Sequence, residues 1–211
     1  SDLDLAAVLA GGNPAPFAGV VHVPSAGLDV VTASPERYLT REGPRLVSSP
    51  IKGTAPTIEA MLTKDVAENV MIVDLVRNDL SRVAEGVHVR RFKYLTELHT
   101  SSGPLLQMSS EVVGSVDRSE GLRLGDLILQ LLPAGSISGA PKERTVALIQ
   151  EAEGLPRGFY TGVCGYFDGA SLDSAVLIRF VEEDASGAHF YRSGGGITIN
   201  SVGEDEYHEC L

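Results

Sequence analysis

A lysine in an apolar and turn-forming setting is the first candidate for chemistry. In the segment "SSPIKGTAP", residues 48–56, this lysine is Lys52. Most lysines cover apolar surface with their stem and keep the ammonium group in water. Taken alone, Lys52 is therefore typical of a solvated surface, and the other polar residues of the chain must decide whether it belongs to a site.

Carboxylates on a long predicted helix are the second candidate. At about 100° per residue, Asp65, Glu68 and Asp79 fall in one sector of this helix. Apolar residues occur nearly all round it, which predicts burial on more than one face. A buried carboxylate needs a partner cation, hydrogen bonds or a metal. An internal ion pair with Arg77 or Arg82 explains these acids as well as a metal site does.

Two further acids stand near the end of the sequence. Glu206 and Glu209 are three residues apart, so both would face one way on a terminal helix. One carboxylate from each of two helices, with water and substrate oxygens completing the shell, is the pattern expected for Mg²⁺. Acids at the start of a helix also complement its dipole. The spacing alone leaves both interpretations open.

Two glycine-rich loops could approach a ligand. The loop "LLPAGSISGAPKERT", residues 131–145, runs into a helix that starts at proline, so its free backbone N–H groups offer an anion site. The loop "RSGGGIT", residues 192–198, is a second turn where backbone could lie close to a ligand. Neither has the spacing of a phosphate loop or dinucleotide motif. Structural turns explain both loops equally well.

Strands at both ends of the chain, with helices between them, must position these residues. Runs of β-forming residues predict an antiparallel meander over residues 17–49, and Lys52 follows its last strand. Helices are predicted at 64–84, 123–132 and 141–153, and further strands at 87–95, 105–116, 160–167, 172–182 and 188–200, before a final acidic stretch that resembles the opening of a helix. This order favours an α+β fold over a doubly wound parallel sheet.

The composition argues against several classes of function. Acidic residues outnumber basic ones by 28 to 17, and the formal net charge of −11 argues against a nucleic-acid or anionic-membrane surface. No stretch approaches the roughly 20 apolar residues of a membrane span. Cys164 and Cys210 are far apart and indicate neither a metal quartet nor a disulfide framework, so a reducing cytoplasm is the expected location. The length of 211 residues predicts one compact unit.

The motifs, in their order along the chain, resemble those of the chorismate-utilising enzymes. The matching segments are "SPERYL", "PIKGT", "KDVAENVMIVDLVRNDLSRV", "LHTSSG", "LLPAGSISGAPK", "RGFYTGVCGY", "AVLIRF", "RSGGGI" and "EDEYHE". The family includes anthranilate synthase component I, aminodeoxychorismate synthase component I, isochorismate synthase and salicylate synthase. The resemblance implies a two-layer antiparallel β sandwich with peripheral helices and a site in a cleft between them.

The resemblance also implies roles for the polar residues of these motifs. Glu68 and Glu206 would hold Mg²⁺ against the ring carboxylate of chorismate, with Glu209 in support. Glu36 would be the general acid that protonates the departing ring hydroxyl, and His99 would orient or assist beside the ring. The substrate-binding residues would be Thr54 and Ser136 near the ring, and Tyr160, Arg179, Gly194, Gly195 and Gly196 at the enolpyruvyl carboxylate.

Lys52 gains a role from the same resemblance. Lysine between Pro-Ile and Gly-Thr is typical of relatives similar to aminodeoxychorismate synthase, whereas alanine is typical of those that make anthranilate or salicylate. A lysine near a metal and packed against Ile51 would have a lowered pKa, because burial and positive charge both disfavour its charged form. Its amine would add to the ring as the hydroxyl leaves, and ammonia from a glutamine amidotransferase subunit would then displace it. This reaction is a step of para-aminobenzoate and folate biosynthesis.

The chain departs from the family pattern at several positions and at both ends. Ala55, Phe180 and Ser193 replace residues that are usual in relatives. We expect residues 1–211 to form a single catalytic domain that lacks the N-terminal and C-terminal portions of the family domain. A degenerate subunit that binds chorismate or docks a partner without turnover is therefore an alternative. Anthranilate synthase component I is the alternative enzyme. Isochorismate and salicylate synthases use water, and their general-base lysine would lie in the absent N-terminal segment.

Overall fold

The computed structural model describes residues 15–61, 63–100, 103–116, 123–184, 186–199 and 201–210, without the side chains of residues 63, 64, 100 and 209. The described residues form antiparallel sheets with helices, which confirms the predicted α+β class. They divide into two compact units. The terminal unit holds residues up to 35, residues 159–161 and residues from 177 onward, and the central unit holds residues 36–158 and 162–176. The single catalytic domain expected from the sequence stays a prediction.

The terminal unit contains a four-stranded antiparallel sheet and a short helix. The strands are β1 (Phe17–Val23), β2 (Leu28–Ser34), β10 (Phe180–Glu183) and β11 (His189–Tyr191), in the order β1-β2-β10-β11. A 3-10 turn, η1 (Pro24–Ala26), and Gly27 in the left-handed conformation close the hairpin between β1 and β2. Phe180 is buried in this unit, as are Val30, Val31 and Ala33 of β2. Helix α6 (Gly203–Glu209) is the last described element.

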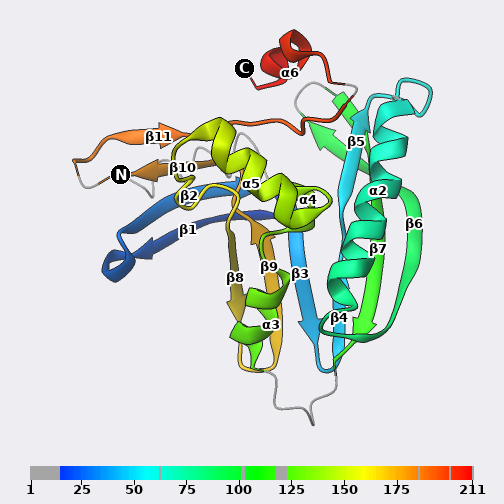
Figure 1. Cartoon of the computed structure of the whole chain (residues 1–211), viewed down its shortest axis with the longest axis horizontal. Helices are drawn as coiled ribbons and strands as arrows, with labels where there is room; N and C mark the ends of the chain where they lie inside the picture. Colours follow the sequence, from blue (N-terminus) through cyan, green and yellow to red (C-terminus); the bar gives the residue numbers. More distant parts are fainter. Residues whose placement is uncertain are drawn as a thin grey trace. The chain divides into compact units, whose positions relative to one another are not determined.

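The central unit is built on a seven-stranded antiparallel sheet (Figure 1). Its strands are β3 (Arg37–Glu42), β4 (Arg45–Ser48), β5 (Ile51–Ala55), β6 (Glu85–Thr100), β7 (Gly103–Ser115), β8 (Val163–Phe167) and β9 (Ser171–Val176). They follow the order β5-β7-β4-β3-β9-β8, and β6 also pairs with β7. Strand β7 therefore carries β4, β5 and β6 as partners, and it joins the segment around Lys52 to the rest of the sheet.

Helix α2 (Thr63–Leu80) packs on the sheet beside β5 and β7 (Figure 1). A buried hydrogen bond fixes it there, because Ser110 Oγ on β7 donates to Asn69 Oδ1 at 2.7 Å. The other helices of the central unit are α3 (Leu124–Leu131), α4 (Gly135–Ser138) and α5 (Lys142–Glu153). Among the helices described, none is both long and apolar enough to cross a membrane.

The chain changes sheets at two points that the sequence pattern does not reveal. The four strands of the predicted meander lie where they are expected, but β2 pairs with β10 whereas β3 pairs with β9. Pro35 follows β2 and has no N–H group to continue a ladder. The predicted strand 172–182 is likewise divided into β9 and β10, and Arg179 in the break has a φ of 52°. The prediction of one continuous meander is therefore wrong in its connections.

Helix α2 differs from its prediction in two respects. It ends at Leu80 rather than at residue 84, because tight turns with i to i+3 hydrogen bonds follow over residues 79–83. Burial does not extend all round the helix, since Val70 and Met71 are exposed. The helix is nevertheless covered by both the sheet and α4, as the prediction of burial on more than one face requires.

Candidate active site

A β-bulge places Lys52 on strand β5. The register of β5 against β7 shifts between Ile51 and Thr54, and Gly53 within this bulge has a φ of 88°. A Cβ atom on Gly53 would lie 2.9 Å from Cβ of Asp65 on α2, so both the backbone conformation and the available space require glycine. The bulge brings β5 close to α2 and re-aims the neighbouring side chain.

Lys52 lies beside a carboxylate of helix α2. Its Nζ is 3.5 Å from Glu68 Oε2, and the two side chains are 28% and 12% exposed, respectively. The next residue, Asn69, accepts the buried hydrogen bond from Ser110 that holds α2 on the sheet. This bond therefore also fixes the part of the helix that carries Glu68. The structure thus brings together two residues that the sequence assigns to one site. The cation beside Glu68 is a lysine rather than one of the arginines considered from the sequence.

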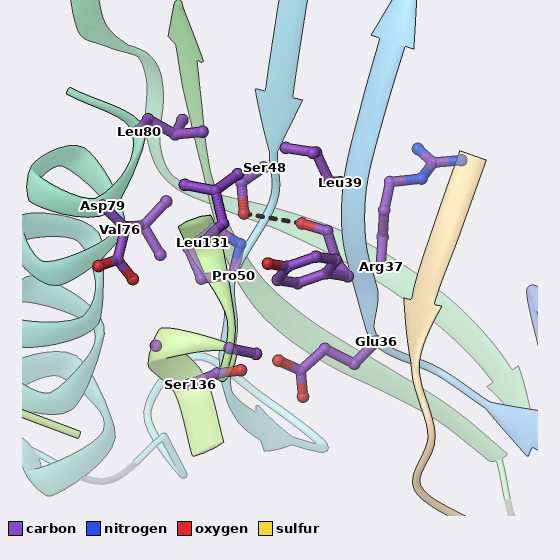
Figure 2. A pocket seen from close by; sticks show the side chains of 13 residues that line it. Glu36, Arg37, Leu39, Ser48, Pro50, Val76, Asp79, Leu80, Leu131 and Ser136 are labelled. Carbon is purple, nitrogen blue, oxygen red and sulfur yellow. Dashed lines mark hydrogen bonds between the residues drawn. The ribbon is translucent and has the colours of Figure 1, made fainter. Parts of the chain in front are cut away.

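A hollow in the central unit lies beside the start of β3. It is partly open to solvent. Glu36 and Ser136 both line it, and Figure 2 shows the Glu36 carboxyl group directed toward the turn that carries Ser136. The main-chain oxygen of Glu36 accepts a hydrogen bond from the Val176 N–H group at 3.0 Å, which anchors this part of the chain to β9.

Burial makes Glu36 a candidate proton donor. It raises the pKa of the Glu36 carboxyl group above the ordinary value, and the hydrogen bond with Ser136 and the charge of Lys52 offset this effect only in part. A carboxyl group that keeps its proton closer to neutral pH is suited to general acid catalysis. Lys52 acts on Glu36 through its charge, but it is not among the residues that line the hollow.

Tyr38 and Lys142 beside this hollow were missed by the sequence analysis. Tyr38 is the extra residue of a bulge where β3 shifts register against β9, and burial together with the charge of Asp79 raises the pKa of its phenol. Lys142, at the start of α5, donates from Nζ to Asp79 Oδ2 at 2.8 Å. One sequence signal was available for Lys142, since a lysine in the first turn of a helix opposes the helix dipole.

Thr54 and His99 lie elsewhere in the central unit. Thr54 is exposed on β5, where it pairs with Gln107 of β7. His99 is 85% exposed near the end of β6, and its Nδ1 lies 3.7 Å from Glu97 Oε1. Neither residue lines the hollow beside Glu36. Their roles stay predictions.

The remaining predicted residues belong to the terminal unit, where several lie together. A Cβ atom on Gly194 would lie 2.5 Å from the hydroxyl oxygen of Tyr160, so the absence of a side chain lets the backbone lie against the phenol. A Cβ atom added to Gly195 would lie 3.4 Å from Glu206 Oε2. Arg179 is exposed. The glycine run therefore lies between a phenol and a buried carboxylate.

Glu68 of the central unit and Glu206 of the terminal unit each offer a carboxylate of the kind that Mg²⁺ binds. Glu206 is only 6% exposed. Glu68 already has a cation beside it, the ammonium group of Lys52. No group of three or more His, Cys, Asp or Glu side chains suited to a metal occurs within the described residues, but Mg²⁺ usually takes one or two protein carboxylates. The side chain of Glu209, predicted as support, lies outside the described residues.

Sequence comparisons point to one family. A model of the family described as chorismate binding enzyme matches residues 1–211. An "Uncharacterized PabA-like protein" of Haemophilus influenzae is 45% identical over 188 residues, and the match covers 86% of this chain and 57% of that protein. Anthranilate synthase component 1 of Thermus thermophilus is 39% identical over 213 residues, which are 94% of this chain and 44% of that protein.

Solved structures have the same fold. Anthranilate synthase component I from Streptococcus pneumoniae superposes with a TM-score of 0.82 at 28% identity, over 100% of this chain and 48% of that one. A putative 2,3-dihydroxybenzoate-specific isochorismate synthase from Bacillus anthracis gives a TM-score of 0.71 at 25% identity, over 92% of this chain and 54% of that one. The chain thus spans about half the length of the proteins it matches.

Proposed function

The chain belongs to the family of chorismate binding enzymes, and from that membership we propose that it catalyses the Mg²⁺-dependent amination of chorismate with ammonia to aminodeoxychorismate. This is the reaction of an aminodeoxychorismate synthase component I, and its product leads to para-aminobenzoate and folate. The proposal concerns the whole protein, since the matches cover only 57% and 44% of the relatives from Haemophilus influenzae and Thermus thermophilus.

The position of Lys52 carries the proposal. Its side chain is mostly buried, lies 3.5 Å from the proposed metal ligand Glu68, and interacts electrostatically with Glu36. A lysine on a solvated surface could pair with a glutamate, but it would not lie close enough to a buried carboxyl group such as that of Glu36 to affect it. An amine and a buried acid close to one another are the two groups that a substitution at a poor leaving group requires.

The proposed reaction assigns a separate task to each of these two residues. Lys52 Nζ, once deprotonated, bonds to a ring carbon of chorismate while the ring hydroxyl takes the proton of Glu36 and leaves as water. Ammonia then bonds to the carbon para to the carboxylate, the bond between carbon and Nζ breaks, and its electron pair returns to Lys52. A proton from the incoming ammonia restores Glu36.

The other predicted residues bind and orient the substrate in this proposal. Glu68 and Glu206, with Glu209 in support, would hold Mg²⁺, which would neutralise the charge of the ring carboxylate. Thr54, His99 and Ser136 serve the ring, and Tyr160, Arg179 and the backbone of Gly194, Gly195 and Gly196 serve the enolpyruvyl carboxylate. A glutamine amidotransferase subunit supplies ammonia, and the cytoplasm is the proposed location.

Anthranilate synthase component I is the second candidate function. It is favoured by the relative from Thermus thermophilus, which carries that name at 39% identity. Lys52 argues against it, since alanine is typical at this position of enzymes that make anthranilate. A subunit that binds chorismate without turnover is the third candidate.

Product analysis tests these alternatives. The protein is incubated with chorismate, Mg²⁺ and an ammonium salt, and the products are separated by liquid chromatography with mass detection. We expect the para-amino product, and we expect its loss in Lys52→Ala. Lys93→Ala removes another ammonium group from the same sheet and should leave turnover unchanged.

Three results would contradict the proposal in different ways. An ortho-amino product would identify an anthranilate synthase. Full turnover by Lys52→Ala would remove the lysine from the mechanism. Binding of chorismate in isothermal titration, with no product of either kind, would favour the binding subunit.

A further inference from the structure

A buried ion pair joins helix α2 to the start of helix α5. Lys142 Nζ lies 2.8 Å from Asp79 Oδ2, and the two side chains are 15% and 10% exposed, respectively. Lys142 Nζ also donates to the main-chain oxygen of Leu131 at 3.1 Å. One ammonium group therefore ties the end of α3, the start of α5 and the C-terminal end of α2 together.

The segment between these two tied points rests directly on α2. A Cβ atom on Gly135, the first residue of α4, would lie 3.1 Å from Asp79 Oδ2 and 3.1 Å from Cγ of Leu75. Such contacts are tighter than a side chain normally accepts, so glycine lets the backbone approach the same carboxylate that Lys142 binds. Ser136 is the next residue along this turn, and it makes a hydrogen bond with Glu36.

We propose that the Asp79–Lys142 ion pair is a positioning device that holds the α4 turn on helix α2 and keeps Ser136 within hydrogen-bonding reach of Glu36. Asp79 and Lys142 are positioning residues, since they act on Glu36 through Ser136. The proposal rests on the proposed function only for the role of Glu36 as the acid of the reaction.

Stability alone is a weak reason for this ion pair. Removing two charges from water is costly, and a buried pair is often no more stabilising than apolar residues of similar volume. The pair instead fixes the position of the Lys142 ammonium group relative to α2. Its charged hydrogen bond to Asp79 and its second bond, to the main-chain oxygen of Leu131, together determine where Lys142 lies. A placement role explains why charges are used at this point.

The ionisable groups around Glu36 come from several elements. Lys52 reaches it from β5, and Tyr38 of β3 and Asp79 of α2 line the same hollow. Arg37 follows Glu36 in sequence but is bound to Asp173 on β9 through two hydrogen bonds of 3.0 and 2.9 Å. A change in the Asp79–Lys142 pair therefore affects Glu36 both through Ser136 and through the charge of Asp79, and the experiment must separate the two.

The test removes both charges at once and follows Glu36 itself. The double variant Asp79→Asn/Lys142→Met keeps side-chain volume nearly constant and leaves no unpaired charge. Carboxyl carbon NMR, with Glu36→Gln to assign the signal, measures the pH at which Glu36 titrates. Loss of the Ser136 hydrogen bond moves this midpoint upward, whereas the joint loss of the opposite charges of Asp79 and Lys142 moves it little, because their effects on Glu36 oppose one another. We expect an upward shift like that of Ser136→Ala, and no further upward shift when the two changes are combined.

Kinetics with chorismate provide a second readout. We expect kcat of the double variant to fall about tenfold with KM nearly unchanged, because the acid is misplaced while the substrate contacts remain. When the double variant is combined with Ser136→Ala, kcat should fall no further than it does in Ser136→Ala alone. The exposed pair Glu153–Arg157 supplies the control, and Glu153→Gln/Arg157→Met should leave both readouts as in the unaltered protein.

A folded double variant whose Glu36 midpoint is unchanged or lowered would overturn the proposal. If that variant does not fold, Gly135→Ala tests the same placement, since its Cβ atom would push the turn away from Asp79 and should also raise the midpoint. The NMR readout needs no turnover. A shifted midpoint in a protein without chorismate activity would therefore support the positioning role while contradicting the proposed function.

Discussion

At the scale of single residues, Glu36 combines a useful proton with an unfavourable environment. Burial raises the pKa of its carboxyl group, and Ser136 and Lys52 only partly counter that effect. The folded protein therefore holds this proton more tightly than the unfolded chain does. Between the ordinary pKa of a glutamate and the raised value, stability falls as pH rises, because the folded state must bury a charge that the unfolded chain leaves in water.

Replacing Glu36 by glutamine should separate stability from activity. We expect Glu36→Gln to unfold at a higher temperature than the unaltered protein at about pH 8, and the difference to vanish as pH falls below the ordinary pKa of glutamate. Activity should fall by roughly 10²- to 10⁴-fold. Thermal unfolding followed by circular dichroism across this pH range measures the first effect. A constant difference in unfolding temperature at all pH values would contradict it.

At the scale of elements, two bulges determine where the chemistry lies. Lys52 and Gly53 interrupt the register of β5, and Tyr38 interrupts that of β3 beside Glu36. Bulges bend a strand and re-aim the side chains next to them, and they are frequent near active sites. The same residues in regular strands would alternate between the two faces of the sheet, and Lys52 would have a different direction.

Gly53→Ala should be markedly destabilising. Gly86 also has a positive φ, of 60°, but a Cβ atom there would meet nothing within 4 Å. Gly86→Ala should therefore cost only the conformational strain, about 1 kcal/mol in the free energy of unfolding. Gly53→Ala adds a clash with Asp65 on α2 and should cost roughly 3 kcal/mol in the free energy of unfolding. Urea unfolding of the two variants measures the difference. Equal costs would mean that β5 and α2 do not pack as described.

The hydrogen bond between Asn69 and Ser110 should couple helix α2 to strand β7 energetically. Both residues are fully buried, so removal of either side chain leaves a partner without its bond and should cost about 1–3 kcal/mol. The double variant should cost less than the sum of the single ones, with a coupling of about 1 kcal/mol. Ser81→Ala is the control, since it removes an exposed hydroxyl group that donates to the main-chain oxygen of Arg77. It should change the free energy of unfolding little. Additive effects would contradict the coupling.

The sequence predicted the elements better than their connections. Period-2 runs placed the first four strands, and the proline and glycine around residues 141–154 placed helix α5. The transfer of the chain between sheets at Pro35 and Arg179 depends on which distant strand offers a partner, and local pattern carries no such information. Lys142 was missed for the same reason, because its partner Asp79 is 63 residues away. Family motifs supplied the site residues, and the structure brings Lys52 to Glu68 and Ser136 to Glu36.

At the scale of the whole molecule, the net charge opposes the proposed substrate. A protein with a formal charge of −11 repels a dianion at long range. The positive charge that the described central unit offers close to Glu36 is that of Lys52, and Glu68 lies beside it. A divalent cation on Glu68 would neutralise local charge, but it must compete with the ammonium group of Lys52 for the same carboxylate.

This competition makes the effect of Mg²⁺ on stability informative. A ligand that binds only the folded state raises the unfolding temperature, and at a given ligand concentration the rise grows with the logarithm of the affinity. We expect Mg²⁺ to raise the unfolding temperature of the unaltered protein, to raise that of Lys52→Ala by more, and to leave that of Glu68→Gln nearly unchanged. Lys93→Ala should respond as the unaltered protein does.

Excess chelator should abolish turnover, and added Mg²⁺ should restore it. Turnover that persists in chelator would exclude the metal, whereas an equal Mg²⁺ response in Lys52→Ala would mean that the ion does not replace Lys52 at Glu68.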